Sequence, residues 1–306
     1  MTRVWPCVIL LTLKEIYKMK TILVTGATGF LGYHLIEELL KYEELHVIAI
    51  GGKPEDKANL LPNHPNLHFH PLSSLFEKYF SNIDTVVNCA FARNNDAKQL
   101  AEALDFTEKA IKRFEELRVN SVINISSQGV YQRLGVGELS KEDSAIQPID
   151  LYSMAKYACE KLFRISNIPF VTNVRLASLY MPQRFLHFFI QKAIKGESFT
   201  LTAPNQYAAL LDVTDAASGL ASITMLSPTK RANIYNLGIG TQYSLLDYAE
   251  SVQRIGESLG YDVKFDVSDN EVTVCAGMDC TRLTTDTGWK ASIMKDEMIK
   301  IIFKQI

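Results

Sequence analysis

The stretch TILVTGATGFLG at residues 21–32 constrains the fold of this chain more than any other segment. An apolar, β-branched run ends at Val24, and glycines follow at Gly26, Gly29 and Gly32. Amphipathic sequence with helical spacing comes next, which gives the order strand, tight glycine turn, helix. Glycines let a backbone approach a pyrophosphate closely, and the first turn of a helix presents free N–H groups to it. The segment therefore predicts a dinucleotide-binding unit, although its G-x-x-G-x-x-G spacing differs from the dehydrogenase pattern G-x-G-x-x-G.

A tyrosine and a lysine four residues apart, Tyr152 and Lys156, form the second informative pattern. The two side chains share one face of a predicted helix. A free phenol has a pKa of about 10, and a neighbouring ammonium lowers that value because it favours the phenolate. Tyr152 could then exchange a proton with a substrate while hydride moves to or from a nicotinamide. Such a pair is also common on ordinary solvated helices, so the hypothesis depends on neighbouring motifs such as the strand that ends in Ser126 and Ser127.

The order of these motifs resembles that of the extended short-chain dehydrogenases/reductases, and in particular the NAD-dependent sugar epimerase/dehydratase family. The resemblance extends from Lys20 over nearly the whole chain. It implies that Ser127, Tyr152 and Lys156 are the catalytic residues. The segments that carry it are TGATGFLG at 25–32, DTVVNCA at 84–90, INISSQGVY at 123–131, YSMAK at 152–156, NVRLASLYMP at 173–182, DVTDAA at 212–217, NIYNLG at 233–238 and GW at 288–289.

The same resemblance implies which residues contact a cofactor, NAD(P). Family members often carry an Asp for the adenosine ribose, or an Arg for a 2′-phosphate, after the second strand. Here Lys53 stands in that segment and could meet a 2′-phosphate or lie in solvent, so NAD and NADP both stay open. The implied cofactor contacts are Gly26, Thr28, Gly29, Phe30, Leu31, Gly32, Lys53, Ala90, Tyr152 and Lys156.

Substrate contacts are implied for Ser127, Gln128 and Ser178. Family members often bind the phosphate of a nucleotide sugar through an Arg that precedes the segment beginning at Asp212, and this chain has none there. A substitute cation must then come from elsewhere in the chain. The candidates are Arg231, which we include among the predicted substrate contacts, together with Arg175 and Arg184.

The residues after the catalytic hydroxyl bear on the type of reaction. Sugar dehydratases of the family carry an Asp–Glu pair there, whereas this chain has Gln128 and Gly129. Elimination needs an acid and a base beyond the Tyr–Lys pair, so a 4,6-dehydratase is disfavoured. The leading hypothesis is an NAD(P)-dependent epimerase or ketoreductase acting on an activated, nucleotide-linked sugar, with Tyr152 as the acid/base. The alternative is a non-catalytic, NADP-binding regulatory protein of the same fold.

Composition limits the partners of this chain. A net charge of −2 without a basic block argues against nucleic acid, and no apolar stretch is long enough to cross a bilayer. Five scattered cysteines without C-x-x-C spacing suit reduced thiols in a cytoplasm better than disulfides or zinc. His64, His68 and His70 lie close in sequence, but a solvated strand edge explains them better than a metal site, so no metal is expected.

Alternating strand and helix patterns predict an α/β fold, a Rossmann-type doubly wound parallel sheet with a smaller C-terminal substrate lobe. The expected division is an extension at 1–18, a dinucleotide-binding domain at 19–175 and a mainly substrate-binding lobe at 176–306. The extension is interpreted as an upstream start-codon choice or a loosely packed appendage. The resemblance implies a homodimer through helices near 97–117 and 151–165. The expected strands are 20–25, 45–50, 66–70, 84–89, 121–126 and 170–175, and the other expected helices are 29–42, 74–80, 184–195, 213–226 and 244–259.

Overall fold

A seven-stranded sheet forms the centre of the molecule. The computed structural model describes residues 19–52, 61–92, 94–182, 184–268 and 275–306. All neighbouring strands of the sheet are parallel, in the order β11-β6-β5-β4-β1-β2-β3. This doubly wound order confirms the predicted fold class. The strands are β1 (Lys20–Thr25), β2 (Leu45–Gly51), β3 (Leu67–Pro71), β4 (Thr85–Asn88), β5 (Ser121–Ser127), β6 (Phe170–Leu176) and β11 (Ile234–Leu237).

The central strands are apolar on both faces because a helical layer covers each face. In β1, Leu23 packs into one hydrophobic core, whereas Ile22 and Val24 pack into the core on the opposite face. In β4, Val86 and Val87 are divided between the two cores in the same way. Continuous apolar runs are therefore expected here, since successive side chains of a strand point to opposite faces.

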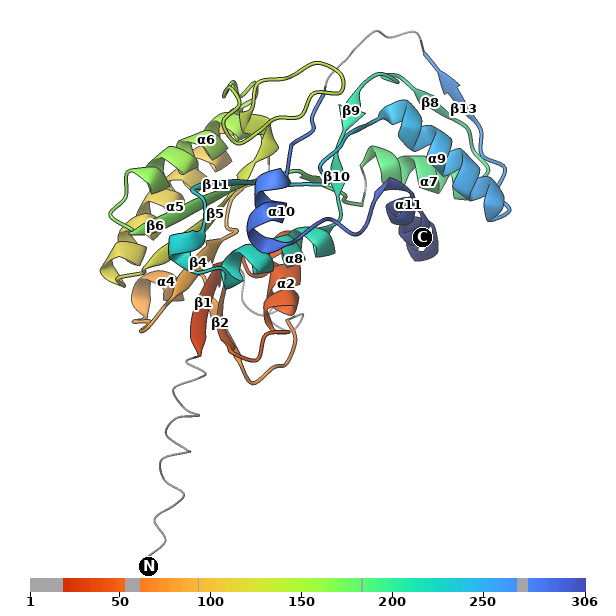
Figure 1. Ribbon diagram of the computed structural model, residues 1–306. Coiled ribbons are helices and arrows are strands. Elements are labelled where there is room, and N and C mark those ends of the chain that lie inside the picture. Colours follow the sequence, from red (N-terminus) through yellow and green to blue (C-terminus); the bar gives the residue numbers. More distant parts are fainter. Residues whose placement is uncertain (1–18, 53–60, 93, 183, 269–274) are drawn as a thin grey trace, which may run out of the picture.

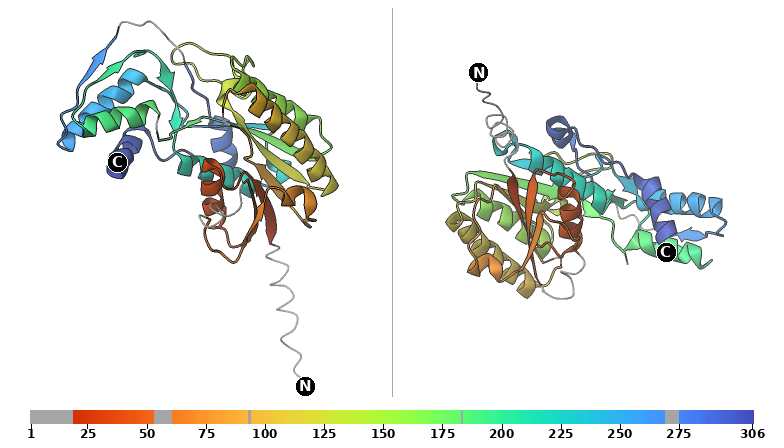
Figure 2. Two further views of the ribbon diagram at one scale, coloured as in Figure 1. Left: turned by 180° about the vertical axis from the view of Figure 1, so that it is seen from behind. Right: turned by 90° about the horizontal axis from the view of Figure 1, so that it is seen from below.

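Helices α2 and α8 pack against each other on one face of the sheet, and α4, α5 and α6 cover the other face (Figures 1 and 2). The structure confirms the predicted helices, with ends that differ by a few residues. The helices are α2 (Phe30–Leu39), α4 (Ser74–Glu77), α5 (Ala97–Glu116), α6 (Leu151–Arg164), α7 (Phe185–Ile194), α8 (Val213–Met225), α9 (Leu245–Ser258), α10 (Thr281–Thr287) and α11 (Lys295–Gln305), with 3-10 turns η1 (Gln128–Val130) and η2 (Pro228–Lys230).

A row of hydrogen-bonded polar side chains crosses the buried sheet. Thr25 Oγ1 donates to Asn88 Oδ1 at 2.7 Å, and Asn88 Nδ2 donates to Asn124 Oδ1 at 3.1 Å. Asn124 Nδ2 then donates to Asn173 Oδ1 at 2.9 Å. The four residues lie directly opposite one another in β1, β4, β5 and β6. Because unpaired buried amides are costly, this row fixes the register of the strands that end at the site described below.

The C-terminal part of the chain builds a smaller lobe around α7, α9 and α11, beside the sheet (Figure 1). This lobe is discontinuous in sequence. The chain leaves the sheet near the expected boundary at residue 176, but residues 210–237 return to it, since α8 packs on α2 and β11 joins the sheet edge beside β6. Short strands complete the lobe and its connections: β7 (Ser178–Leu179), β8 (Phe199–Leu201), β9 (Tyr207–Ala208), β10 (Leu210–Leu211), β12 (Tyr243–Ser244) and β13 (Phe265–Val267).

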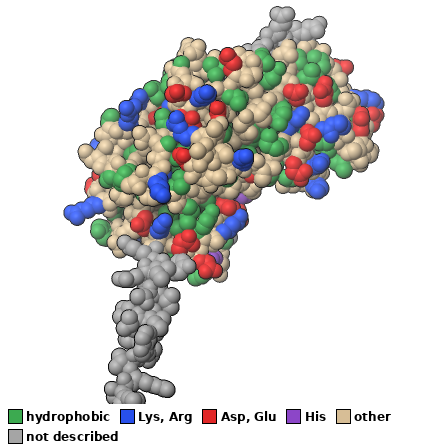
Figure 3. All heavy atoms as spheres, in the orientation of Figure 1, with side chains coloured by type: hydrophobic (Ala, Val, Ile, Leu, Met, Phe, Trp, Pro, Cys, Tyr) green, Lys and Arg blue, Asp and Glu red, His purple; other side chains and the backbone are tan. Residues whose placement is uncertain are grey.

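The expected N-terminal extension, residues 1–18, lies outside the described residues. Within the described part of the chain, none of the helices combines the length and the apolar character needed to cross a membrane. The same part contains no group of three or more His, Cys, Asp or Glu side chains that could hold a metal ion. On the face drawn in Figure 3, basic and acidic side chains are interspersed rather than gathered by sign.

Candidate active site

Two adjoining cavities lie at the carboxyl ends of the central strands. The first, which we call the glycine cavity, has a volume of ≈ 340 Å³ and is lined by the glycine turn, Cys89, Phe91 and Lys156. The second, the lobe cavity, has a volume of ≈ 420 Å³ and reaches the C-terminal lobe at Phe185. The two cavities share four lining residues, Ser127, Tyr152, Ser178 and Leu179. A group held in one cavity could therefore react with a group held in the other across this shared wall.

The glycine turn between β1 and α2 packs closely against backbone and lines the glycine cavity. Gly26 has φ +69°, and a Cβ at this position would lie 2.8 Å from the backbone nitrogen of Ala90. A Cβ at Gly32 would lie 2.2 Å from the carbonyl oxygen of Gly26. No side chain caps the N-terminus of α2, and its first turn has no acidic residue. These features fit a pyrophosphate of a dinucleotide, which binds free N–H groups at a helix N-terminus.

Helix α6 holds Tyr152 and Lys156 at the junction of the two cavities. Asp150 caps this helix, because its carboxylate accepts a hydrogen bond of 2.7 Å from the backbone N–H of Ser153. The backbone N–H of Tyr152 donates to Asn95 Oδ1 at 3.0 Å, which links the first turn of α6 to the segment after β4. Tyr152 lines both cavities, and Lys156, one turn later, lines the glycine cavity. The predicted shared face of the two side chains is thus turned toward the site.

The ammonium of Lys156 is buried, with 6% of the residue exposed. It donates a 2.7 Å hydrogen bond to the carbonyl oxygen of Ile125 and lies 4.2 Å from the centroid of the Phe91 ring. Burial lowers the pKa of Lys156 to about 8, since removal from water disfavours the charged form. Burial also raises the pKa of the nearby Cys89 thiol to about 12, so that this thiol remains protonated.

A buried ion pair fixes the strand that carries Ser127. Arg175 on β6 donates two hydrogen bonds to the carboxylate of Glu160 on α6, at 3.0 and 2.9 Å. Ser126 Oγ donates to the same carboxylate at 2.5 Å. Arg175 and Glu160 are 3% and 4% exposed. This cluster ties α6 to β5 and β6 immediately beside Ser127, whose own Oγ accepts a 3.1 Å hydrogen bond from the N–H of Gly129.

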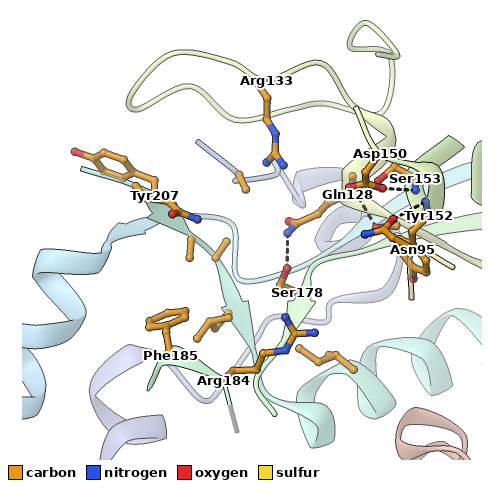
Figure 4. A pocket seen from close by; sticks show the side chains of 18 of the residues that line it. Asn95, Gln128, Arg133, Asp150, Tyr152, Ser153, Ser178, Arg184, Phe185 and Tyr207 are labelled. Atoms are coloured by element: carbon orange, nitrogen blue, oxygen red, sulfur yellow. Dashed lines mark hydrogen bonds between the residues drawn. The ribbon is translucent and has the colours of Figure 1, made fainter. Parts of the chain in front are cut away.

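The lobe cavity brings polar side chains from distant segments together (Figure 4). Gln128 Nε2 donates to Ser178 Oγ at 2.9 Å, whereas Gln128 Oε1 is buried and has no hydrogen-bond partner in the described structure. Arg133 points into the cavity from the loop after η1, and Arg184 points toward Ser178 from the opposite wall. Asp150 is the one carboxylate among the described lining residues, and it is engaged as a helix cap.

The structure gathers most of the predicted site residues, but not all of them. Thr28 lies against Gly51 and does not line the glycine cavity, and Ala90 approaches Gly26 through its backbone. Lys53 lies outside the described residues. The predicted residues that line one or both cavities are Gly26, Gly29, Phe30, Leu31, Gly32, Ser127, Gln128, Tyr152, Lys156 and Ser178.

Arg231 and Arg175 do not supply the substitute cation that the sequence suggested. The guanidinium of Arg231 donates to the carbonyl oxygens of Ile223 and Thr224 and to Ser121 Oγ, at the start of β5 and thus at the opposite end of that strand from Ser127. Arg175 is paired with Glu160, as described above. We therefore exclude both from the candidate site, and Arg184 is the remaining candidate of the three that lines the lobe cavity.

Sequence reasoning missed several residues of the site. Phe91 and Asn95 follow β4, and this position after a buried strand could have identified them from the sequence as site residues. Arg133 gave no such signal, because it lies in an irregular loop, and only the tertiary fold places it over the lobe cavity.

Comparisons with known proteins identify the family of this chain. The NAD dependent epimerase/dehydratase family model matches residues 22–238. The chain belongs to this family. A Bacillus subtilis protein described as an uncharacterized UDP-glucose epimerase is 24% identical over 264 residues, which cover 76% of this chain and 81% of that protein. A dTDP-4-dehydro-6-deoxy-D-allose reductase of a Streptomyces species is 27% identical over 267 residues, which cover 77% of this chain and 81% of the reductase.

Two solved structures share the fold of this chain. The UDP-glucuronic acid 4-epimerase of Bacillus cereus, solved with UDP-glucuronic acid and NAD, gives a TM-score of 0.75 at 20% identity and covers 93% of this chain and 99% of its own. An enzyme of Bordetella bronchiseptica, solved with NAD and UDP, gives a TM-score of 0.74 at 21% identity over 93% of this chain and 94% of its own. These likenesses show that the chain shares the fold of the two proteins.

Proposed function

We propose that this family member is an NAD(P)-dependent epimerase or ketoreductase that acts on an activated, nucleotide-linked sugar. The observation that carries the proposal is the shared wall between the two cavities, which contains Ser127 and Tyr152. A nicotinamide cofactor in the glycine cavity would supply hydride transfer when bound. The sugar would lie in the lobe cavity, with its reacting oxygen at the shared wall.

Each of the three predicted catalytic side chains has a distinct role in this proposal. Tyr152 donates or accepts the proton at the reacting oxygen of the sugar. Lys156 supplies a positive charge one helical turn away, which favours the phenolate form of Tyr152, and it holds the hydroxyls of the nicotinamide ribose. Ser127 orients the reacting oxygen through a hydrogen bond. All three line the glycine cavity, so one bound cofactor would lie within reach of the set.

The residues of the lobe cavity disfavour elimination. The neutral side chain of Gln128 stands directly after Ser127, and Gly129 offers no side chain. The carboxylate of Asp150 is occupied by the backbone of α6. A 4,6-elimination requires an additional acid and base, so we propose that the reaction stops at oxidation and reduction.

The substitution Tyr152→Phe tests the proposed chemistry. It removes the hydroxyl that transfers the proton but keeps the ring, so kcat should fall by about 10²- to 10⁴-fold while NADH affinity stays within about twofold of the wild type. The measurement is turnover of UDP-linked and dTDP-linked hexoses, with NADH affinity followed by nicotinamide fluorescence. Unchanged turnover in the variant would contradict the role of Tyr152. Retained NADP binding without turnover in the wild type would favour the alternative, a regulatory protein.

Nucleotide released from the denatured, purified protein separates the two reactions within the proposal. An epimerase reduces and reoxidises its cofactor in one turnover, so near-stoichiometric bound NAD is expected. A ketoreductase exchanges its cofactor in each cycle, so little retained nucleotide and ready binding of added NADPH or NADH are expected.

A further inference from the structure

Phe91 lines the glycine cavity and contacts Lys156. Its half-buried ring follows β4. The ring centroid lies 4.2 Å from Lys156 Nζ, and the ring makes an edge contact with Tyr152 at a centroid distance of 6.1 Å. One aromatic side chain therefore contacts two of the three residues that we assign to the reaction.

The donors of Lys156 explain why this contact matters. An ammonium has three N–H donors. The carbonyl oxygen of Ile125 takes one of them at 2.7 Å. The neighbouring hydroxyls of a ribose would need the other two, and the π face of Phe91 covers the ammonium on one side. Such a cation–π contact is strong when the cation is desolvated, as Lys156 is at 6% exposure.

A neighbouring groove could accept the Phe91 ring if it moved away from Lys156. Phe91 also lines this open groove of ≈ 260 Å³, together with the apolar Leu72, Ala103 and Phe106 and the polar Gln99 and Glu102. The ring would keep apolar contacts with Leu72, Ala103 and Phe106 there. The groove lies on the side of Phe91 toward α5, whereas Lys156 belongs to the glycine cavity.

We propose that Phe91 competes with the nicotinamide ribose for the ammonium of Lys156, and that it sets how tightly the cofactor is held. The inference rests on the proposed function, because it requires a nicotinamide cofactor in the glycine cavity. The ribose displaces the ring toward the groove beside Phe106, and the lost cation–π contact weakens binding of the nicotinamide half. Phe91 thus favours exchange of the cofactor between turnovers, as a ketoreductase needs.

The substitution Phe91→Ala tests this competition by nucleotide binding rather than by turnover. The Kd for NADH should fall about tenfold, equivalent to about 1.4 kcal/mol. The Kd for ADP should stay unchanged, since ADP lacks the nicotinamide ribose. Phe91→Leu keeps apolar bulk without a π face and should also tighten NADH binding, which protects the test against misfolding of the alanine variant. Phe76→Ala is the matched control, because Phe76 contacts Phe106 but lines neither the groove nor the glycine cavity.

The outcomes separate the inference from the proposed function. Tighter NADH binding in both Phe91 variants, with unchanged ADP binding, supports the competition. Unchanged or weaker NADH binding in the variants, beside clear binding by the wild type, overturns the inference and leaves the proposed function intact. An equal gain in affinity for NADH and ADP also overturns the inference, because the substitution would then act on the adenosine half of the nucleotide. If neither the wild type nor the variants bind NADH or NADPH, the proposed cofactor site itself is wrong.

Discussion

At the scale of single residues, the proposed role of Lys156 requires a positive charge in a buried position. The chain buries this ammonium and gives it one carbonyl and one aromatic face as partners. Burial lowers its pKa to about 8, which lies close to neutral pH. The positive charge that supports Tyr152 is therefore present at neutral pH and is lost in mildly alkaline solution.

This pKa predicts opposite trends for activity and stability. Above about pH 8, kcat/KM should fall roughly tenfold per pH unit, because it reports ionisation of the free enzyme. Between pH 8 and the ordinary lysine value of 10.5, the unfolded chain binds the proton that the folded chain has released. The contribution of Lys156 to the free energy of unfolding should therefore rise with pH over this window.

Both trends can be measured on one pair of proteins, the wild type and Lys156→Met. Urea unfolding at several pH values should show a smaller rise between pH 8 and 10.5 in the variant, which has no charge to lose at this position. A wild-type pH–activity profile that stays flat to pH 10 would show that the reaction does not require the ammonium.

At the scale of elements, a buried cluster around Glu160 ties α6 to β5 and β6. Glu160 lies one turn after Lys156 and receives hydrogen bonds from Ser126 on β5 and Arg175 on β6. The guanidinium of Arg175 also lies 4.6 Å from the ring centroid of Tyr131. These contacts orient the helix that carries Tyr152 against the strand that carries Ser127.

We expect Glu160→Gln to lower the free energy of unfolding by about 3 kcal/mol, because it leaves the buried guanidinium of Arg175 without its anion. The kcat should fall as well, since α6 is no longer fixed against β5. Glu108→Gln is the matched control: it breaks an exposed pair with Lys112 on α5 and should change stability by less than about 0.5 kcal/mol. Urea unfolding of the two variants makes the comparison, and equal effects would show that the buried cluster does not hold α6.

Most of the elements could be predicted from the sequence because their causes are local. Glycine spacing, apolar runs and helical periodicity all lie within one segment, and they predicted six of the seven strands of the sheet and seven of the nine described helices, whereas β11, α10 and α11 were not predicted. The roles of Ser127, Tyr152 and Lys156 came from the family resemblance and stay predictions. The partners of charged side chains are not local. Arg231 and Arg184 looked alike as candidate cations, yet the first pairs with groups at the start of β5 and the second lines the lobe cavity.

At the scale of the whole molecule, the chain passes between the sheet and the C-terminal lobe more than once. The short, turn-rich elements after residue 176 gave no sign of which would return to the sheet, because an isolated four-residue strand such as β11 carries little periodicity. Its partner β6 lies far away in sequence, and the register between Ile234 and Asn173 follows from the packed fold. The lobe cavity has the same origin, since it collects residues from segments on both sides of these crossings.

The outer face of α6 carries exposed apolar side chains where the homodimer contact is expected. Leu151 and Met154 are each 50% exposed, and Ile165, just after the helix, is 78% exposed. The three share one face at helical spacing. The neighbouring α5 carries exposed ion pairs instead, so the apolar contact would centre on α6. Exposed apolar stripes of this kind are typical of protein interfaces.

We expect the wild-type protein to be a dimer and Met154→Lys to be a monomer. A two-fold interface repeats every residue, so a single substitution places two lysines near the same axis, where their charges repel each other in an apolar contact. Light scattering coupled to size exclusion, over a dilution series, measures the mass directly. Phe188→Lys is the control, because Phe188 is 47% exposed but belongs to α7 in the C-terminal lobe, and it should leave the dimer intact. A wild-type monomer at every concentration, or a dimer that only Phe188→Lys disrupts, would place the interface elsewhere or remove it.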